Sequence, residues 1–153
     1  MLQAGDKAPE FNLPDADMTV SDSSDLAGKP YVIYFYPKDD TPGCTMEGIE
    51  FTDLLSDFES LGATVFGVSK DTCVSHAAFR DKHGIAVQLL ADVEGQLCDA
   101  YDVWQEKEKN GEKKMGIVRS TFIVDGTGII RHAMYDVKPK GHAEQVLELV
   151  REL

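Results

Sequence analysis

One cysteine with unusual neighbours is the strongest chemical signal in this chain of 153 residues. Cys44 closes the stretch PKDDTPGC, which begins at Pro37 and directly follows the apolar run YVIYFY at Tyr31–Tyr36. A β-branched and aromatic run that ends at a proline is typical of a buried strand. Thr41 is a favourable N-cap, and Pro42 is a favourable first residue of a helix. The sequence therefore predicts that Cys44 lies in the first turn of a helix, just past a core strand.

A cysteine in this position is suited to nucleophilic chemistry, because the thiolate is the reactive form. A free cysteine has a pKa of about 8.5, and a helix N-terminus together with a cation lowers such values to roughly 3.5–7.5. The free amide donors are expected near Gly43, Cys44 and Thr45. The helix dipole contributes only about 0.3–1 kcal/mol, and Asp39 and Asp40 oppose it. A cation from elsewhere in the chain is therefore required.

The plain alternative for Cys44 is a small buried hydrophobic residue, which describes most free cysteines. The pattern P-x-x-x-T-x-x-C, formed here by Pro37, Thr41 and Cys44, speaks against that alternative. It resembles the active-site signature of the peroxiredoxins. Three ordered segments extend the resemblance to the Q-type branch, also called bacterioferritin comigratory proteins: GDKAPEFNLPD at Gly5–Asp15, FYPKDDTPGCTMEG at Phe35–Gly48 and GIVRSTFIVD at Gly116–Asp125.

This resemblance implies a thioredoxin-like α/β fold, with a central mixed sheet flanked by helices and an N-terminal hairpin addition. It implies a thiol peroxidase that reduces hydrogen peroxide and organic hydroperoxides in antioxidant defence. The reaction would pass through a sulfenic acid at Cys44, which thioredoxin or another thiol would recycle. No cofactor and no metal are implied.

Four further residues are candidates for the site, and for Arg119 the role follows from the resemblance. Thr41, the Cys44 amide and Arg119 would bind the peroxide oxygens, Pro37 would shield the sulfur from water, and Glu47 would support Arg119. Each residue also has a plain alternative role. Thr41 is a helix cap, Pro37 terminates a strand, and Arg119 and Glu47 are ordinary surface residues.

The chain departs from its relatives in how the sulfenic acid would be resolved. Q-type proteins commonly carry a second cysteine at positions that Ile49 and Arg80 occupy here. Cys73 precedes Arg80 by two helical turns, about 10 Å along the axis, so bonding to Cys44 would require local unwinding. The cycle therefore uses either Cys44 alone or Cys44 with Cys73. Cys98 lies among apolar residues and is expected in the core.

The elements that would position these residues follow from periodicity and turn signals. The apolar face that begins near Cys44 continues through Phe51 and Phe58 to Leu61, which predicts one helix. Charged, unpatterned residues from Gln105 to Met115 predict a solvated loop anchored by Trp104. The remaining expectations are short strands at Phe11–Leu13 and Met18–Val20, an exposed turn at Ser21–Asp25, strands at Ala63–Ser69, Val87–Ala91, Ser120–Val124 and Gly128–Val137, and helices at Thr72–His83, Gly95–Tyr101 and 143–153.

Size and charge limit the classes of function. Residues 1–153 are expected to form a single domain. Three cysteines do not make a secreted disulfide framework, and no stretch is long and apolar enough for a membrane span, so a cytoplasmic protein is expected. The resemblance to the Q-type branch implies a monomer, because relatives of that branch are frequently monomeric. The net charge of −12 argues against nucleic acid as a partner.

Three rival functions are weaker. A disulfide exchanger needs a C-x-x-C pair, whereas the chain reads Cys44-Thr45-Met46-Glu47. A cysteine hydrolase needs an oriented histidine base, and the four histidines lack a signature and are expected at the surface or at helix caps: His76, His83, His132 and His142. Cys73 and His76 supply only half a zinc site. A non-catalytic interaction module has only the acidic surface and the charged Gln105–Met115 loop in its favour.

Overall fold

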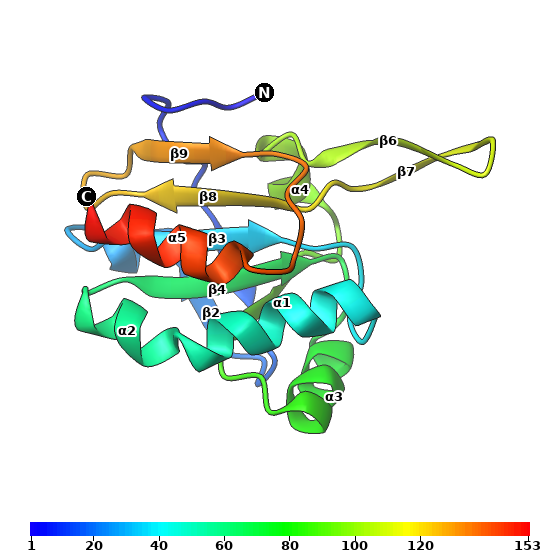
Figure 1. Cartoon of the computed structure of the whole chain (residues 1–153), viewed down its shortest axis with the longest axis horizontal. Helices are drawn as coiled ribbons and strands as arrows, with labels where there is room; N and C mark the ends of the chain where they lie inside the picture. The colour runs from blue at the N-terminus through cyan, green and yellow to red at the C-terminus, as the bar shows by residue number, and fades with distance from the viewer.

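The computed structural model describes all 153 residues, and its centre is a five-stranded mixed sheet with the strand order β5-β4-β3-β8-β9 (Figure 1). The pairings β3–β4 and β4–β5 are parallel, and β3–β8 and β8–β9 are antiparallel. The predicted α/β fold with a central mixed sheet is confirmed. The strands are β3 (Tyr31–Phe35), β4 (Thr64–Ser69), β5 (Gln88–Ala91), β8 (Ser120–Val124) and β9 (Ile130–Met134).

Helices cover both faces of this sheet. One face carries the elements α1 (Pro42–Asp53), α2 (Leu55–Ser60), α3 (Cys73–His83) and α5 (His142–Arg151), which share one buried cluster with the sheet. The other face carries α4 (Gln96–Ala100) and the N-terminal segment, which contains β1 (Asn12–Pro14), β2 (Val20–Asp22) and the 3₁₀ helix η1 (Ser23–Leu26). The antiparallel pair β1–β2 confirms the predicted N-terminal hairpin.

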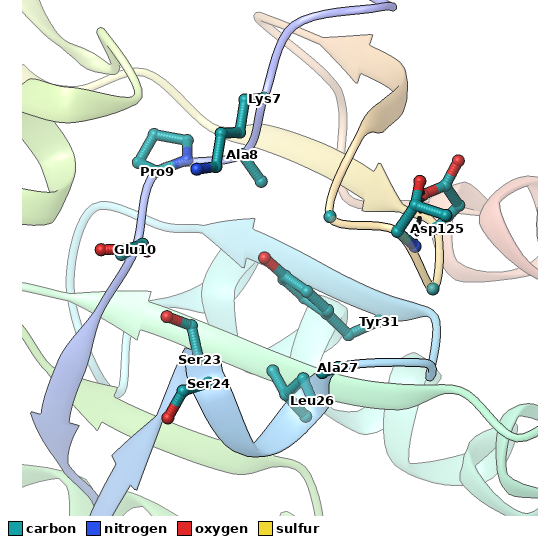
Figure 2. Close-up of a pocket in the computed structure, with 13 residues that line it drawn as sticks. Lys7, Ala8, Pro9, Glu10, Ser23, Ser24, Leu26, Ala27, Tyr31 and Asp125 are labelled. Atoms are coloured by element: carbon teal, nitrogen blue, oxygen red, sulfur yellow. Dashed lines mark hydrogen bonds between the residues drawn. The ribbon is translucent and has the colours of Figure 1, made fainter.

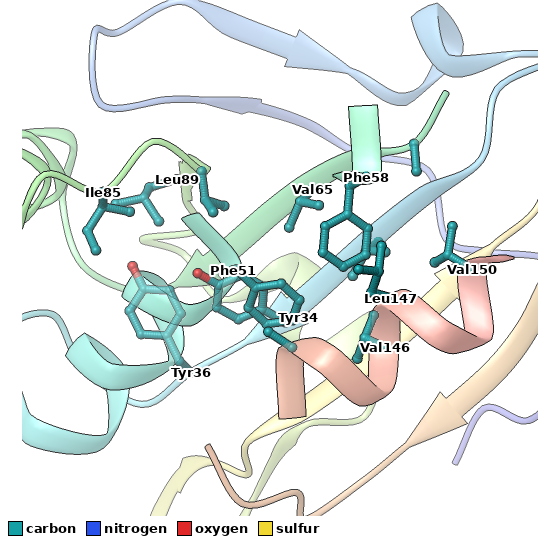
Figure 3. Close-up of a cluster of buried hydrophobic side chains, with 14 of the residues drawn as sticks. Tyr34, Tyr36, Phe51, Phe58, Val65, Ile85, Leu89, Val146, Leu147 and Val150 are labelled. Atoms are coloured by element: carbon teal, nitrogen blue, oxygen red, sulfur yellow. The ribbon is translucent and has the colours of Figure 1, made fainter. Parts of the chain in front are cut away.

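Strand β3 contributes residues to the hydrophobic clusters on both faces of the sheet, because its side chains point alternately to one face and the other. Tyr34 points toward α1 and packs against Phe51, with the two rings stacked 4.5 Å apart (Figure 3). Ile33 and Phe35 point to the opposite cluster. Burying a large side chain such as Phe51 contributes roughly 1.5–3 kcal/mol to stability. This packing fixes α1, and with it Cys44, on the sheet.

The helix that begins near Cys44 is shorter than the sequence predicts. It ends at Asp53, and Leu54, with φ −101° and ψ 4°, separates it from α2. Phe51 and Phe58 are both fully buried in one cluster with their rings 5.9 Å apart. The break at Leu54 could not be predicted from the apolar periodicity, because Phe51 before it and Phe58 after it both point into the same buried cluster.

The expectation of a solvated loop at residues 105–115 is wrong. This region forms an antiparallel hairpin of β6 (Trp104–Lys109) and β7 (Glu112–Ile117), which projects from the body of the protein (Figure 1). Asn110 and Gly111 have φ of 54° and 80°, the left-handed conformation that a two-residue hairpin turn requires. Charged side chains occupy both faces, so the strands lack the apolar alternation that normally reveals them.

The exposed turn expected at Ser21–Asp25 is wrong, because these residues form the end of β2 and most of η1, and the first three of them are half-buried. The other predicted elements are confirmed to within a few residues. Helix α3 begins after Thr72, whose hydroxyl accepts a bond from the Ser75 amide, and it ends at Gly84 with φ of 66°. Cys98 is fully buried as expected, and burial followed by the nearby Asp92 raises the pKa of its thiol far above the ordinary value. None of the helices combines the length and the apolar character needed to cross a membrane.

Candidate active site

Cys44 lies in the first turn of α1 and is only 2% exposed. Thr41 is the N-cap residue, but its hydroxyl donates to the Lys38 carbonyl oxygen at 2.7 Å and makes no side-chain cap bond, contrary to expectation. The Thr45 amide is also not free, because it bonds to the Thr41 carbonyl oxygen at 2.8 Å. The amides of Gly43 and Cys44 have no acceptor in the protein, so they remain available as donors beside the sulfur.

The pairing of strands brings Arg119 to Cys44. Ser120, the first residue of β8, lies opposite Phe35 at the end of β3, so the residue before it lies where the chain turns toward α1. Arg119 Nη2 donates to Cys44 Sγ at 3.4 Å, and Nη1 donates to Glu47 Oε1 at 2.7 Å. The Arg119 side chain is 14% exposed. The cation that the sequence required is therefore in contact with the sulfur.

Glu47 is the buried carboxylate of this group. Its side chain is fully buried, Oε1 accepts from Arg119, and Oε2 has no hydrogen-bond partner. Burial raises the pKa of Glu47 from 4.5 to about 7, although the nearby Arg119 charge acts in the opposite direction. Burial also opposes the charge of Arg119, but Glu47 and Cys44 outweigh it and raise the arginine pKa. Arg119 thus stays charged, whereas Glu47 titrates near neutral pH.

Glu47→Gln is expected to remove a pH-dependent loss of stability. The pKa of Glu47 is higher in the folded protein than in the unfolded chain, so its contribution is fully present below pH 4.5 and is lost as the pH rises through about 7. The shift corresponds to roughly 3 kcal/mol. Urea unfolding between pH 4.5 and 8 should show wild type losing about that much stability relative to Glu47→Gln.

The exposed Glu94 supplies the matched control, since Glu94→Gln should follow wild type at every pH. A difference between wild type and Glu47→Gln that stays constant across this pH range, or that increasingly favours wild type at high pH, contradicts the assignment of a raised pKa to Glu47.

Gly43, expected as an amide donor, has a second role at the site that the sequence did not indicate. A Cβ atom at this position would lie 3.1 Å from Arg119 Nη2 and 3.5 Å from Pro139 Cγ. Its absence gives the guanidinium room beside the first turn of α1. The only sign of this role in the sequence was a glycine, a poor helix former, at the start of a helix. No sequence pattern indicated that Pro139 lies nearby.

The Asp39 carboxylate has hydrogen-bond partners of its own, so its negative charge does not act without compensation on a thiolate at Cys44. Its buried carboxylate accepts from Tyr36 Oη at 2.6 Å and Ser75 Oγ at 2.8 Å, and it lies 2.8 Å from His76 Nδ1. The other ring nitrogen of His76 lies 2.9 Å from the Leu90 carbonyl oxygen. Both ring nitrogens thus lie within hydrogen-bond distance of an oxygen, so the ring is held between Asp39 and the Leu90 carbonyl.

The expectation of surface or cap positions is therefore wrong for His76, and it is also wrong for His142. His142 is buried, its Nε2 lies 2.7 Å from Thr121 Oγ1, and burial lowers its pKa. Asp40, the other acidic residue before Cys44, pairs with Lys82 and His83 at 2.7 Å each. Sequence gave no sign of these pairings because the partners are far apart in the chain.

The other candidate residues form no hydrogen bond to the sulfur. Pro37 is exposed in the loop after β3. Cys73 begins α3, is half-buried, and forms no disulfide. Arg80, at a position where relatives carry a cysteine, pairs with Asp17 at 2.8 Å and Asp81 at 3.0 Å. Arg119 bonds to both Cys44 and Glu47, and Thr41 lies at the helix cap.

A separate concavity of about 180 Å³ lies at the opposite end of the sheet, and Figure 2 shows the residues around it. Tyr31 lines it from the start of β3, and Asp125 lines it just past the end of β8. The Asp125 carboxylate is engaged by Thr127 and the Ile129 amide. This concavity contains no group from the cysteine site.

The cysteine site places one cation and two free amide donors beside a thiol. The Arg119 guanidinium is positioned to stabilise a thiolate at Cys44, and the free amides of Gly43 and Cys44 can bind an oxygen on which negative charge develops. His76 is not a base for this sulfur, since both of its nitrogens are engaged elsewhere. The arrangement suits attack on a bond that releases an oxygen anion.

Comparison with known proteins agrees with this chemistry. The AhpC/TSA family profile matches residues 4–133. Peroxiredoxin Bcp of Bacillus subtilis is 40% identical over 152 residues, covering 99% of this chain and 97% of the relative. Peroxiredoxin Bcp of Xanthomonas campestris is 46% identical over 125 residues, covering 82% of this chain and 78% of the relative.

Two solved structures extend the similarity to the fold. A cysteine-to-serine variant of Xylella fastidiosa PrxQ superposes with a TM-score of 0.94 at 40% identity, covering 99% of this chain and 97% of that one. The bacterioferritin comigratory protein of Xanthomonas campestris, studied for alkyl peroxide reduction, has a TM-score of 0.88 at 42% identity, covering 93% and 90%. With the thioredoxin-like fold and a cysteine–arginine pair at its centre, the chain belongs to the AhpC/TSA family, in the Bcp/PrxQ branch of the peroxiredoxins, and is a thiol peroxidase.

Proposed function

We propose that Cys44 is the peroxidatic nucleophile of this thiol peroxidase and that Arg119 is its principal electrostatic partner. The observation that carries the proposal is the 3.4 Å contact between Arg119 Nη2 and Cys44 Sγ in the first turn of α1. Cys98 is buried on the other face of the sheet with a raised pKa, and Cys73 has no such cation. Of the three thiols, only Cys44 is bonded to an arginine.

In the proposed reaction the Cys44 thiolate attacks one peroxide oxygen in line with the O–O bond. A sulfur–oxygen bond forms as the O–O bond breaks, and the departing oxygen takes a proton to leave as water or an alcohol. Arg119 and the free amides of Gly43 and Cys44 hold the oxygens as charge develops. Since the Thr41 hydroxyl donates to Lys38, its oxygen lone pairs accept a hydrogen bond from the peroxide.

The substrates proposed are hydrogen peroxide and organic hydroperoxides. The work on alkyl peroxide reduction by the Xanthomonas campestris relative supports the second class. Pro37 limits water access from its exposed position in the loop before α1, and Glu47 positions the Arg119 guanidinium. We place this activity in the cytoplasm and propose that residues 1–153 work as a single monomeric domain, recycled by thioredoxin or a small thiol.

The activity is tested by following peroxide consumption with dithiothreitol as the reductant. Saturable turnover that requires both the protein and the thiol is expected with hydrogen peroxide and with cumene hydroperoxide. Consumption no faster than the protein-free background with either peroxide contradicts the proposal.

We propose further that the cycle uses one cysteine of this chain. The first turn of α3, which carries Cys73, is held by the bonds from Ser75 and His76 to the buried Asp39 carboxylate. Releasing Cys73 to meet Cys44 would break this network as well as unwind α1. The sulfenic acid at Cys44 is therefore resolved by a thiol from outside the chain.

Digestion without reductant after one equivalent of hydrogen peroxide tests this cycle. Mass spectrometry is expected to find oxidised Cys44 and no peptide linked to Cys73. A Cys44–Cys73 linked peptide formed in high yield, and absent from Cys73→Ser, would show a two-cysteine cycle instead.

A further inference from the structure

The β6–β7 hairpin carries a cluster of lysines on one face. Lys107 lies opposite Lys114 and Lys109 lies opposite Glu112, so these four side chains share that face of the two-stranded sheet. Together with Asn110 and Met115 they line a cavity of about 370 Å³. We call this surface the lysine face. Three lysines within one small cavity stand out in a chain whose net charge is −12.

The lysine face lies next to the cysteine site. Strand β7 ends at Ile117, two residues before Arg119, and β8 begins opposite the end of β3 that leads to Cys44. The Lys107 stem lies over Gly116, where an added Cβ would be 3.3 Å from Lys107 Cδ. Burial lowers the pKa of Lys107, and the positive charge of Arg119 lowers it further, while Cys44 and Asp136 act in the opposite direction. The Lys107 ammonium is thus electrostatically coupled to the active site.

Most of the charge on the lysine face is free to bind a ligand. Lys114 pairs with Glu112 at 3.6 Å, and both side chains are highly exposed. Lys107 and Lys109 form no ion pair. The chemistry of the lysine face is that of a site for an anionic group.

The missing resolving cysteine creates a need for such a site. Ile49 and Arg80 stand where relatives carry a second cysteine, so an external thiol must reach the sulfenic acid at Cys44. The overall negative charge repels acidic molecules at long range, and the lysine face reverses that repulsion locally. An acidic small thiol held there would be anchored on the chain segment that leads directly to Arg119, the hydrogen-bond partner of Cys44.

We propose that the lysine face binds the acidic groups of a low-molecular-weight thiol that resolves Cys44. This inference rests on the proposed peroxidase cycle. The thiolate of the small molecule attacks the Cys44 sulfur, a sulfur–sulfur bond forms, the sulfur–oxygen bond breaks, and the hydroxyl leaves as water after taking a proton. A second molecule of thiol then attacks the outer sulfur, which releases Cys44 and the oxidised small disulfide.

The test compares an acidic and a neutral thiol in the second half-reaction. Cys44 is first oxidised with one equivalent of hydrogen peroxide, and the decay of the sulfenic acid is then followed with mercaptosuccinate or 2-mercaptoethanol. Each rate is expressed per thiolate, and the quantity compared is the mercaptosuccinate-to-mercaptoethanol ratio. Because both rates come from the same protein, any effect of a substitution on Cys44 itself cancels in the ratio.

Wild type is expected to favour mercaptosuccinate, and the double variant Lys107→Gln/Lys109→Gln should lower the ratio by about tenfold, since each exposed charge pair is worth up to a factor of about five. The preference of wild type should also decrease with added salt, which screens the attraction. Lys113→Gln is the matched control. Lys113 lies opposite Glu108 on the other face of the same hairpin, so its loss should leave the ratio unchanged.

The proposal is overturned if wild type shows no preference for mercaptosuccinate, or if Lys113→Gln lowers the ratio as much as the double variant does. Faster resolution by thioredoxin than by either small thiol, with no dependence on Lys107 and Lys109, also overturns it. Failure of the proposed cycle would look different, because wild-type Cys44 would then give no sulfenic acid in the first step.

Discussion

Cys44→Ser is expected to abolish peroxide turnover, reducing it by at least about 10³-fold to the protein-free background. Serine has almost the same shape, so the contacts of α1 with the sheet remain. A hydroxyl neither ionises near neutral pH nor accepts an oxygen atom from a peroxide, so both the nucleophile and the oxidised intermediate are lost. Peroxide consumption with dithiothreitol as the reductant measures the effect.

Cys73→Ser is the matched control for this experiment. It removes a half-buried thiol at the start of α3 and should keep turnover close to that of wild type. Circular dichroism checks that both variants are folded. Retention of more than a tenth of the activity in folded Cys44→Ser would assign the chemistry to a different thiol.

Arg119→Met is expected to lower kcat/KM for hydrogen peroxide by about 10²–10³-fold, the typical cost of one lost donor to a developing oxyanion. The substitution keeps much of the side-chain volume but removes the cation that contacts Cys44 Sγ. Arg119→Lys should recover only part of the loss, since an ammonium cannot bond to Glu47 and Cys44 through two separate nitrogens. Arg151→Met, at an exposed arginine, should have no effect.

A second variant separates catalysis from folding at this site. Arg119→Met leaves the buried Glu47 carboxyl without its only partner, which costs stability. The double variant Arg119→Met/Glu47→Gln removes the stranded charge and should regain stability without regaining activity. Recovery of activity together with stability would show that Arg119 acts only by keeping α1 in place.

The helices and strands around the site can be predicted from the sequence, because their apolar residues recur at regular spacing and residues typical of caps and turns mark their ends. Strand β3 is continuously apolar, and Thr72 and Gly84 bound α3 as an N-cap and a left-handed C-cap. The cation required at Cys44 could be anticipated from the weakness of the helix dipole alone. Its identification as Arg119 rested on the family motif, because no local pattern connects residues 75 positions apart.

What escaped prediction depends on contacts between distant segments or on surfaces without an apolar face. The β6–β7 hairpin is solvated on both sides, so hydrophobic alternation is absent, and only the Asn110-Gly111 turn signalled it. The pair Asp39–His76 joins the loop before α1 to α3, and neither residue is marked locally as buried. The buried Oε2 atom of Glu47, which has no hydrogen-bond partner, was not predicted, because its burial depends on how completely the surrounding elements exclude water.

The most direct test of the central claim is to trap the oxidised cysteine. Wild-type protein is treated with one equivalent of hydrogen peroxide in the presence of dimedone, which adds to sulfenic acids, and the peptides are then mapped by mass spectrometry. The account predicts one adduct, on Cys44, and much slower formation of that adduct in Arg119→Met. An adduct on Cys73 or Cys98, or peroxide consumption with Cys44 unmodified and still a free thiol, would contradict it.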